Sequence, residues 1–136
     1  MTTPDRAGLT TRVTIAHRFR FEAARRLPTL PADHPCARVH GHGFEVELEV
    51  EGTIDPEIGW VADYAELGQA WRQVMPELDH AYLNDVAGLE NPTSELIAVW
   101  LWRRLDPLLP GLAAVSVMET PTTRVTIRAD RRATEA

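Results

Sequence analysis

The sequence contains no lysine, so all 14 of its basic residues are arginines. This absence excludes catalysis through a Schiff base on a side-chain amine. A pocket for phosphate groups would therefore have to use arginine side chains, backbone amides or helix N-termini. The basic residues are outnumbered by 20 acidic ones, and the net charge of −6 argues against a nucleic-acid-binding protein.

Cysteine is scarce as well, because Cys36 is the only one in the chain. A single cysteine cannot form an internal disulfide, which is typical of proteins from a reducing compartment. The N-terminal segment MTTPDRAGLTTR lacks the apolar core of a signal peptide. No apolar run approaches the ~20 residues that span a bilayer. We therefore expect a soluble, cytoplasmic protein with no membrane or nucleic-acid partner.

The length of 136 residues predicts one domain. We expect this domain at residues 11–130, between flexible polar tails at 1–10 and 131–136. A domain of this size is small for a deep, enclosed active site. We therefore expect the site to be completed by a second subunit.

Alternation of apolar and polar residues predicts four strands. The clearest is the second, in which Phe44, Val46 and two further apolar residues alternate with glutamates. The expected ranges are 12–23, 44–51, 113–119 and 124–129. Exposed strand edges in so small a sheet favour pairing with neighbouring subunits, so the pattern also predicts a homo-oligomer.

Two helices are expected between the second and third strands. Asp63 is a good N-cap for the first helix, and Pro76 should kink or end it. Asn91-Pro92 is a typical start for the second helix, which should end at 110–111. The order β-β-α-α-β-β predicts an α+β fold in which both helices cover one face of an antiparallel sheet.

The segment between the first two strands collects the residues most typical of catalysis. It holds Cys36, followed by His40 and His42 on either side of one glycine. Residues two apart on an extended backbone point to the same face, so the two imidazoles should lie together. Two imidazoles and a nearby thiol indicate a metal site or an acid–base site.

Four segments, taken in chain order, resemble the 6-pyruvoyl/6-carboxytetrahydropterin synthase family. They are FEAARRLP, CARVHGH, LDHAYLND followed by ENPTSE, and VMETPT. The resemblance runs from about Phe19 to Thr123 and is strongest to the bacterial 6-carboxytetrahydropterin synthase branch. It implies the tunnelling fold, in which the β-β-α-α-β-β unit trimerises into a barrel and two trimers pair into a hexamer.

The resemblance also implies a lyase that acts on 7,8-dihydroneopterin triphosphate. In such enzymes zinc, held by three histidines, polarises the side-chain hydroxyls of the substrate. A cysteine assisted by an Asp–His pair moves protons while triphosphate leaves. The bacterial branch also releases acetaldehyde and yields the precursor of deazaguanine compounds such as queuosine.

Residue by residue, the resemblance implies that Cys36 is the general base and that Asp79 with His80 is the proton relay. Glu119 would anchor the guanidine-like edge of the pterin through two parallel hydrogen bonds. The residues that would assist Glu119 are Thr93 and Ser94.

One position departs from the family pattern. The family reads FxAAH where this chain reads FEAAR, so Arg25 stands at the place of a zinc-ligating histidine. Only His40 and His42 would remain as ligands, whereas a catalytic zinc normally has three from the protein. Arginine cannot ligate a metal, and its permanent charge repels a dication. We therefore expect an impaired zinc site, with Arg25 among the substrate-binding residues.

Three functions are compatible with this pattern. The first is the synthase reaction with weak or replaced zinc. The second is a divergent paralogue that binds a pterin or another guanine-like ligand, in a zinc-free reaction with Arg25 as the electrophile. The third is a catalytically silent pterin-binding protein, which the presence of Cys36, Asp79 and His80 disfavours because a pure binder needs neither base nor relay.

Most of these residues also have a structural alternative. His40 and His42 could be polar residues at the entry to a strand, and Glu119 at a strand end could be solvent-exposed or salt-bridged. Cys36 alone would more often be a small buried side chain. Asp79 and His80 could cap the preceding helix. Thr93 and Ser94 could equally be first-turn polar residues of the second helix.

Overall fold

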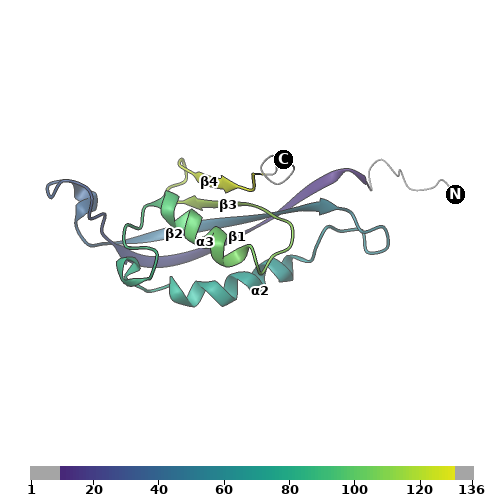
Figure 1. Ribbon diagram of the computed structural model, residues 1–136, viewed down its shortest axis with the longest axis horizontal. Helices are drawn as coiled ribbons and strands as arrows, with labels where there is room; N and C mark the ends of the chain where they lie inside the picture. The colour runs from purple at the N-terminus through teal and green to yellow at the C-terminus, as the bar shows by residue number, and fades with distance from the viewer. Residues whose placement is uncertain (1–9, 131–136) are drawn as a thin grey trace.

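The computed structural model describes residues 10–130, which form a four-stranded antiparallel sheet with two α-helices against one face (Figure 1). The strands follow one another across the sheet in chain order, so the predicted β-β-α-α-β-β arrangement is confirmed. The tails expected at 1–10 and 131–136 lie, apart from Thr10, outside the described residues. The elements are β1 (Arg12–Arg25), η1 (Pro35–Ala37), β2 (His40–Thr53), α2 (Tyr64–Val74), η2 (Met75–Glu77), η3 (Leu83–Asp85), α3 (Ser94–Leu105), β3 (Leu112–Met118) and β4 (Val125–Arg128).

Strands β1 and β2 form a long hairpin that extends beyond the predicted strand limits. Their register pairs Arg12 with Thr53 at one end and Arg25 with His40 at the other. Pairing supplies hydrogen bonds where the apolar alternation fades, which is why both strands continue through the histidine- and glycine-containing segment. The consequence is that Arg25 and His40 sit opposite each other on neighbouring strands.

The two faces of β2 differ sharply. Its apolar residues are buried under the helices, with Phe44, Val46 and Leu48 fully inaccessible to solvent. The intervening glutamates lie on the opposite face and meet arginines of β1 and β4, as in the 2.6 Å contact between Arg18 Nε and Glu47 Oε2 and the 3.8 Å contact between Arg128 and Glu49. The predicted inward and outward alternation of this strand is therefore confirmed.

The helix boundaries follow local capping chemistry. The Asp63 carboxylate accepts a hydrogen bond from Ala65 N at 2.9 Å, which confirms the predicted start of α2. Helix α2 ends at Val74, where Pro76 was expected to stop it, and continues as the 3₁₀ turn η2.

The predicted start of α3 is wrong by a few residues, because Thr93 rather than Asn91 is the N-cap. The Thr93 hydroxyl accepts from Leu96 N at 3.2 Å, and Pro92 precedes the cap instead of lying in the first turn. Helix α3 also ends earlier than expected, at Leu105. Within residues 10–130, no helix is both long enough and apolar enough to cross a membrane.

Candidate active site

The end of β1, the start of α3 and the residue after β3 converge on one pocket of about 340 Å³. Five of the residues singled out in the sequence line this pocket, and they come from four separate segments of the chain. They are Arg25, Cys36, Thr93, Ser94 and Glu119. The fold therefore brings together the predicted base and the predicted anchor, along with the residue that departs from the family pattern.

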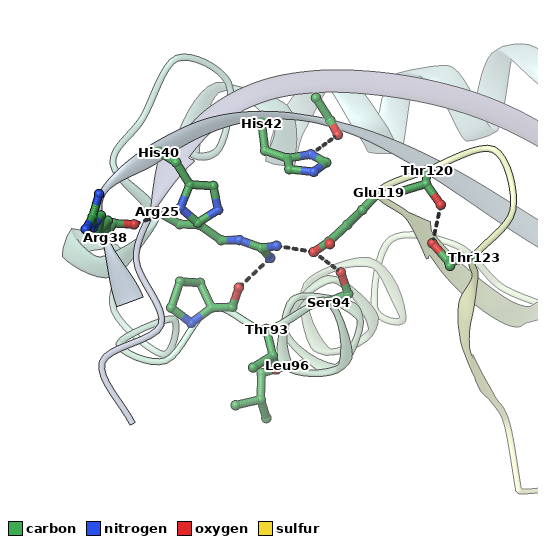
Figure 2. A network of polar contacts seen from close by, with 12 residues as sticks. Arg25, Arg38, His40, His42, Thr93, Ser94, Leu96, Glu119, Thr120 and Thr123 are labelled. Carbon is green, nitrogen blue, oxygen red and sulfur yellow. Dashed lines mark hydrogen bonds and ion pairs between the residues drawn. The ribbon is translucent and has the colours of Figure 1, made fainter. Parts of the chain in front are cut away.

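Arg25 is buried at the bottom of this arrangement, with only 4% of its side chain exposed. Its Nη2 forms an ion pair with Oε1 of Glu119, and its Nη1 donates to the Pro92 carbonyl at 2.9 Å. The guanidinium also lies 5.0 Å from the centroid of the Phe44 ring, in cation–π contact. Figure 2 shows the side chain pointing from β1 toward Glu119. A buried cation requires a counter-charge, and Glu119 supplies it.

Glu119 receives two hydrogen bonds on the same oxygen. Oε1 accepts from Arg25 and also from the Ser94 hydroxyl, at 2.5 Å (Figure 2). Partial burial raises the pKa of Glu119, but the hydrogen bonds from Ser94 and Arg25 outweigh it and hold the pKa below its ordinary value of 4.5. The carboxylate is therefore ionised at neutral pH. Among residues 10–130, no group is hydrogen-bonded to Oε2.

The two polar residues at the start of α3 have different contacts. The Thr93 hydroxyl caps α3, so the contact it makes is a structural one at the start of the helix. The Ser94 hydroxyl points to Glu119 instead. Of this predicted pair, only Ser94 contacts the Glu119 carboxylate.

The two histidines of β2 lie on one face, as their spacing predicted. Their ring centroids are 6.5 Å apart. Nδ1 of His40 is 2.7 Å from the Arg38 carbonyl, and Nδ1 of His42 is 2.5 Å from the Gly43 carbonyl. A carbonyl oxygen can only accept, so in each neutral ring Nδ1 carries the hydrogen and Nε2 keeps its lone pair.

These two imidazoles are not joined by a third metal ligand. Within the described part of the chain, no group of three or more His, Cys, Asp or Glu side chains is placed to hold a metal ion. Arg25 is the strand partner of His40 and brings a permanent positive charge to this position. His34 does not substitute, because its Nδ1 accepts from Cys36 N at 3.1 Å and caps η1. The residues present therefore do not fit a three-ligand zinc site.

Asp79 and His80 form the hydrogen-bonded pair expected of a relay. Asp79 Oδ2 lies 2.9 Å from His80 Nδ1, while Oδ1 accepts from the backbone N–H of Glu22 at 3.0 Å. The Glu22 amide, followed by His80, lowers the pKa of Asp79. His80 has a positive φ of 59° and donates its own amide to the Glu22 carbonyl at 2.6 Å. These contacts dock the pair against β1 and orient the His80 ring.

Within one chain, this relay does not share a pocket with Cys36. His80 is 81% exposed and lines a second hollow, of about 560 Å³, together with His42 and the end of β1. Cys36 and Glu119 line the first pocket only. The structure thus brings the predicted base and the predicted anchor together in one chain, and places the predicted relay elsewhere on its surface.

Two residues that position the site were not identified from the sequence. The Asn84 side chain accepts from Arg26 N at 3.0 Å and donates to Arg26 O at 2.9 Å, which fixes the end of β1. Pro92 contributes the carbonyl that holds Arg25. A loop asparagine gave no specific signal, and Pro92 was interpreted only as a helix-start residue.

Comparison with known proteins gives one consistent result. The profile of the family described as 6-pyruvoyl tetrahydropterin synthase matches residues 14–130. The chain is 43% identical to 6-carboxy-5,6,7,8-tetrahydropterin synthase from Synechocystis sp., over 76% of this chain and 84% of that protein. It is 37% identical to dihydroneopterin monophosphate aldolase from Pyrococcus furiosus, over 71% and 78%. The fold is similar to 6-pyruvoyl tetrahydropterin synthase from Caenorhabditis elegans, with a TM-score of 0.81, 27% identity and coverage of 89% and 98%.

Proposed function

This chain belongs to the 6-pyruvoyl tetrahydropterin synthase family, and from that premise we propose that it is a 6-carboxytetrahydropterin synthase-type lyase acting on 7,8-dihydroneopterin triphosphate. The observation that carries the proposal is the single pocket in which the ionised Glu119 faces the same space as Cys36. An acceptor for a heterocycle and a thiol for proton transfer are the two groups that such a reaction needs.

Glu119 is the proposed anchor of the pterin ring. Its low pKa keeps it ionised, and a carboxylate accepts strong, charge-assisted hydrogen bonds from ring N–H groups. Ser94 holds the carboxylate in place from the start of α3. A ring anchored at Glu119 would direct its side chain along the pocket whose walls include Cys36 and Arg124. Arg124 would leave its 3.7 Å contact with Glu47 to reach the phosphate groups, since the chain has no lysine for this purpose.

Cys36 is the proposed general base, and Asp79 with His80 is the proposed relay. Asp79 fixes the hydrogen on His80 Nδ1, so Nε2 is free to accept a proton. Because His80 is exposed and lines a different hollow of the same chain, we propose that it completes the pocket of a neighbouring subunit. The corresponding assembly would be the homo-hexamer, a dimer of trimers, expected from the sequence.

The family resemblance implies zinc, which would supply polarisation of the substrate hydroxyls when bound. The residues present do not fit that ion, because His40 and His42 lack a third ligand and Arg25 stands beside them. The proposal therefore assigns no step to a metal. The product would be a carboxypterin on the route to deazaguanine compounds such as queuosine, made in the cytoplasm.

The test is a product analysis of the purified protein with 7,8-dihydroneopterin triphosphate. Release of triphosphate and acetaldehyde, lost in Cys36→Ala while neopterin binding is retained, is the expected result. Cleavage of the side chain without loss of phosphate would instead point to a reaction of the kind for which the Pyrococcus furiosus relative is named. No pterin product and no pterin binding would refute the proposal.

A further inference from the structure

We infer that Arg25 supplies the fixed positive charge of this pocket in place of a divalent metal, and that it is a positioning residue for Glu119. By taking one oxygen of Glu119, it leaves a single carboxylate oxygen for a neutral N–H-donating heterocycle. The identity of this ligand as a pterin rests on the function proposed above. The charge arrangement itself rests only on the contacts of Arg25.

The guanidinium is held on three sides. Nη2 contacts Glu119, Nη1 donates to the Pro92 carbonyl at 2.9 Å, and the Phe44 ring packs 5.0 Å away. Only 4% of the side chain is exposed. Moving this buried cation would have a large free-energy cost, because it would lose its counter-ion and its hydrogen bond to Pro92 at the same time.

The charges around Arg25 are already balanced. One guanidinium faces one carboxylate, and the other arginine that lines the pocket, Arg124, is directed to Glu47 at 3.7 Å. A divalent ion bound by His40 and His42 would add two positive charges beside the guanidinium. No further carboxylate of the described chain contacts Arg25 to offset them. The guanidinium of Arg25 therefore repels the ion that the two imidazoles alone would attract.

The same pair restricts what Glu119 can bind. Oε1 accepts from both Arg25 and Ser94, so its two lone pairs are used. Only Oε2 remains for the ligand. The two parallel hydrogen bonds that the resemblance implied, one to each carboxylate oxygen, are therefore replaced by hydrogen bonding to a single oxygen. The positive charge of Arg25 also offsets the negative charge of the carboxylate. A neutral, amide-like ring edge is therefore favoured over a second guanidinium cation, which Arg25 would repel.

The first experiment measures metal directly. The protein is incubated with excess zinc, desalted and analysed by elemental mass spectrometry, and neopterin affinity is then measured by fluorescence with and without EDTA. We expect far less than one zinc per chain and the same neopterin affinity in both conditions. One zinc per chain that survives desalting, or an affinity that EDTA abolishes, would overturn the inference.

The second experiment tests whether Arg25 acts through Glu119. Arg25→Gln should weaken neopterin binding by at least about tenfold, because Glu119 loses the charged donor that orients it, and Arg25→Lys should recover part of that loss. In an E119Q background the same change should have almost no effect, since the residue through which it acts is gone. An equal loss in both backgrounds would show that Arg25 has only a structural role. The adjacent, exposed Arg26 provides the matched control, and Arg26→Gln should bind as the wild type does.

Failure of the inference and failure of the proposed function are distinguishable. If the wild-type protein binds no neopterin, the proposed pterin site is wrong, while the zinc measurement still decides the role of Arg25. If Arg25→Gln does not fold by circular dichroism, Arg25→Lys keeps the charge and tests the same contact. In that variant, zinc uptake to one per chain would contradict the inference, and continued exclusion of zinc would support it.

Discussion

The carboxylate of Glu119 forms an ion pair with the guanidinium of Arg25, although the two residues are 94 positions apart in the sequence. This contact connects the last residue of β1 to the residue that follows β3. It joins two positions that the sequence pattern had assigned to separate tasks, metal binding and pterin binding. The positive charge at residue 25 consequently changes which hydrogen bonds the carboxylate of Glu119 can accept.

Glu119→Gln should lower the free energy of unfolding by about 2–4 kcal/mol, because it leaves a buried guanidinium without its counter-charge. The value is at the lower end for buried pairs, since the Glu119 side chain is 27% exposed and the glutamine can still accept a hydrogen bond. Urea unfolding followed by circular dichroism measures it. Glu77→Gln is the control, because its partner Arg104 is 43% exposed and a solvent-exposed pair contributes little. Equal losses in the two variants would contradict a special role for the Arg25 pair.

The low pKa of Glu119 predicts how stability depends on pH. Its folded-state pKa lies below the ordinary 4.5, so the stabilisation from its ionised form is fully present above about pH 4.5. That stabilisation is lost as the pH falls through the folded-state pKa. Urea midpoints measured between pH 7 and pH 3 should therefore fall less steeply in Glu119→Gln than in the wild type. Asp79 and Glu77 also have lowered pKa values and keep contributing in both proteins, so only the difference between the curves reports Glu119. If the urea midpoints of the two proteins fell in parallel with pH, the assignment of a lowered folded-state pKa to Glu119 would be contradicted.

The separation of the relay from Cys36 predicts complementation between subunits. Cys36→Ala and His80→Ala should each be inactive alone. After mixed subunits are unfolded and refolded together, sites that draw Cys36 from one variant and His80 from the other should restore about a quarter of wild-type activity, as expected for random assembly of shared sites. Subunit exchange would be verified by native mass spectrometry. Mixed oligomers without any activity, or a monomer at micromolar concentration, would show that the site is not shared.

The strand order and helix placement could be predicted from the sequence because they depend on local periodicity. Alternating residues in β2 and the Asp63 cap are signals that a single segment carries by itself. The start of α3 was predicted incorrectly because Pro92 and Thr93 are both good start residues, and only the structure shows that the Pro92 carbonyl is used by Arg25.

The sequence identified several residues that share a pocket, but not how their side chains pair. Cys36, Ser94 and Glu119 were identified from motif positions, and they do line one pocket. The family resemblance showed that Arg25 stands in place of a ligand, but not which group would balance its charge, because that group, Glu119, follows β3 and is distant in the sequence. It also gave no indication that His80 would line a different hollow from Cys36, since this depends on how the loop after η2 docks against β1.

Arg25→His should convert the pocket to the metal-binding type. Residue 25 is the strand partner of His40, and the imidazoles of His40 and His42 both keep Nε2 available, so a third imidazole at this position would complete a three-ligand set. The substitution also removes the guanidinium that repels the ion and frees Oε1 of Glu119 from its ion pair. We expect zinc to rise to about one per chain after loading and desalting, and turnover of 7,8-dihydroneopterin triphosphate to increase by about an order of magnitude or more, since a bound zinc polarises hydroxyl groups. Arg26→His is the control, because it adds an imidazole one residue away, at an exposed position. If Arg25→His folds but takes up no more zinc than Arg26→His, the two histidines of β2 are not metal ligands in this chain, and the resemblance does not extend to its metal site.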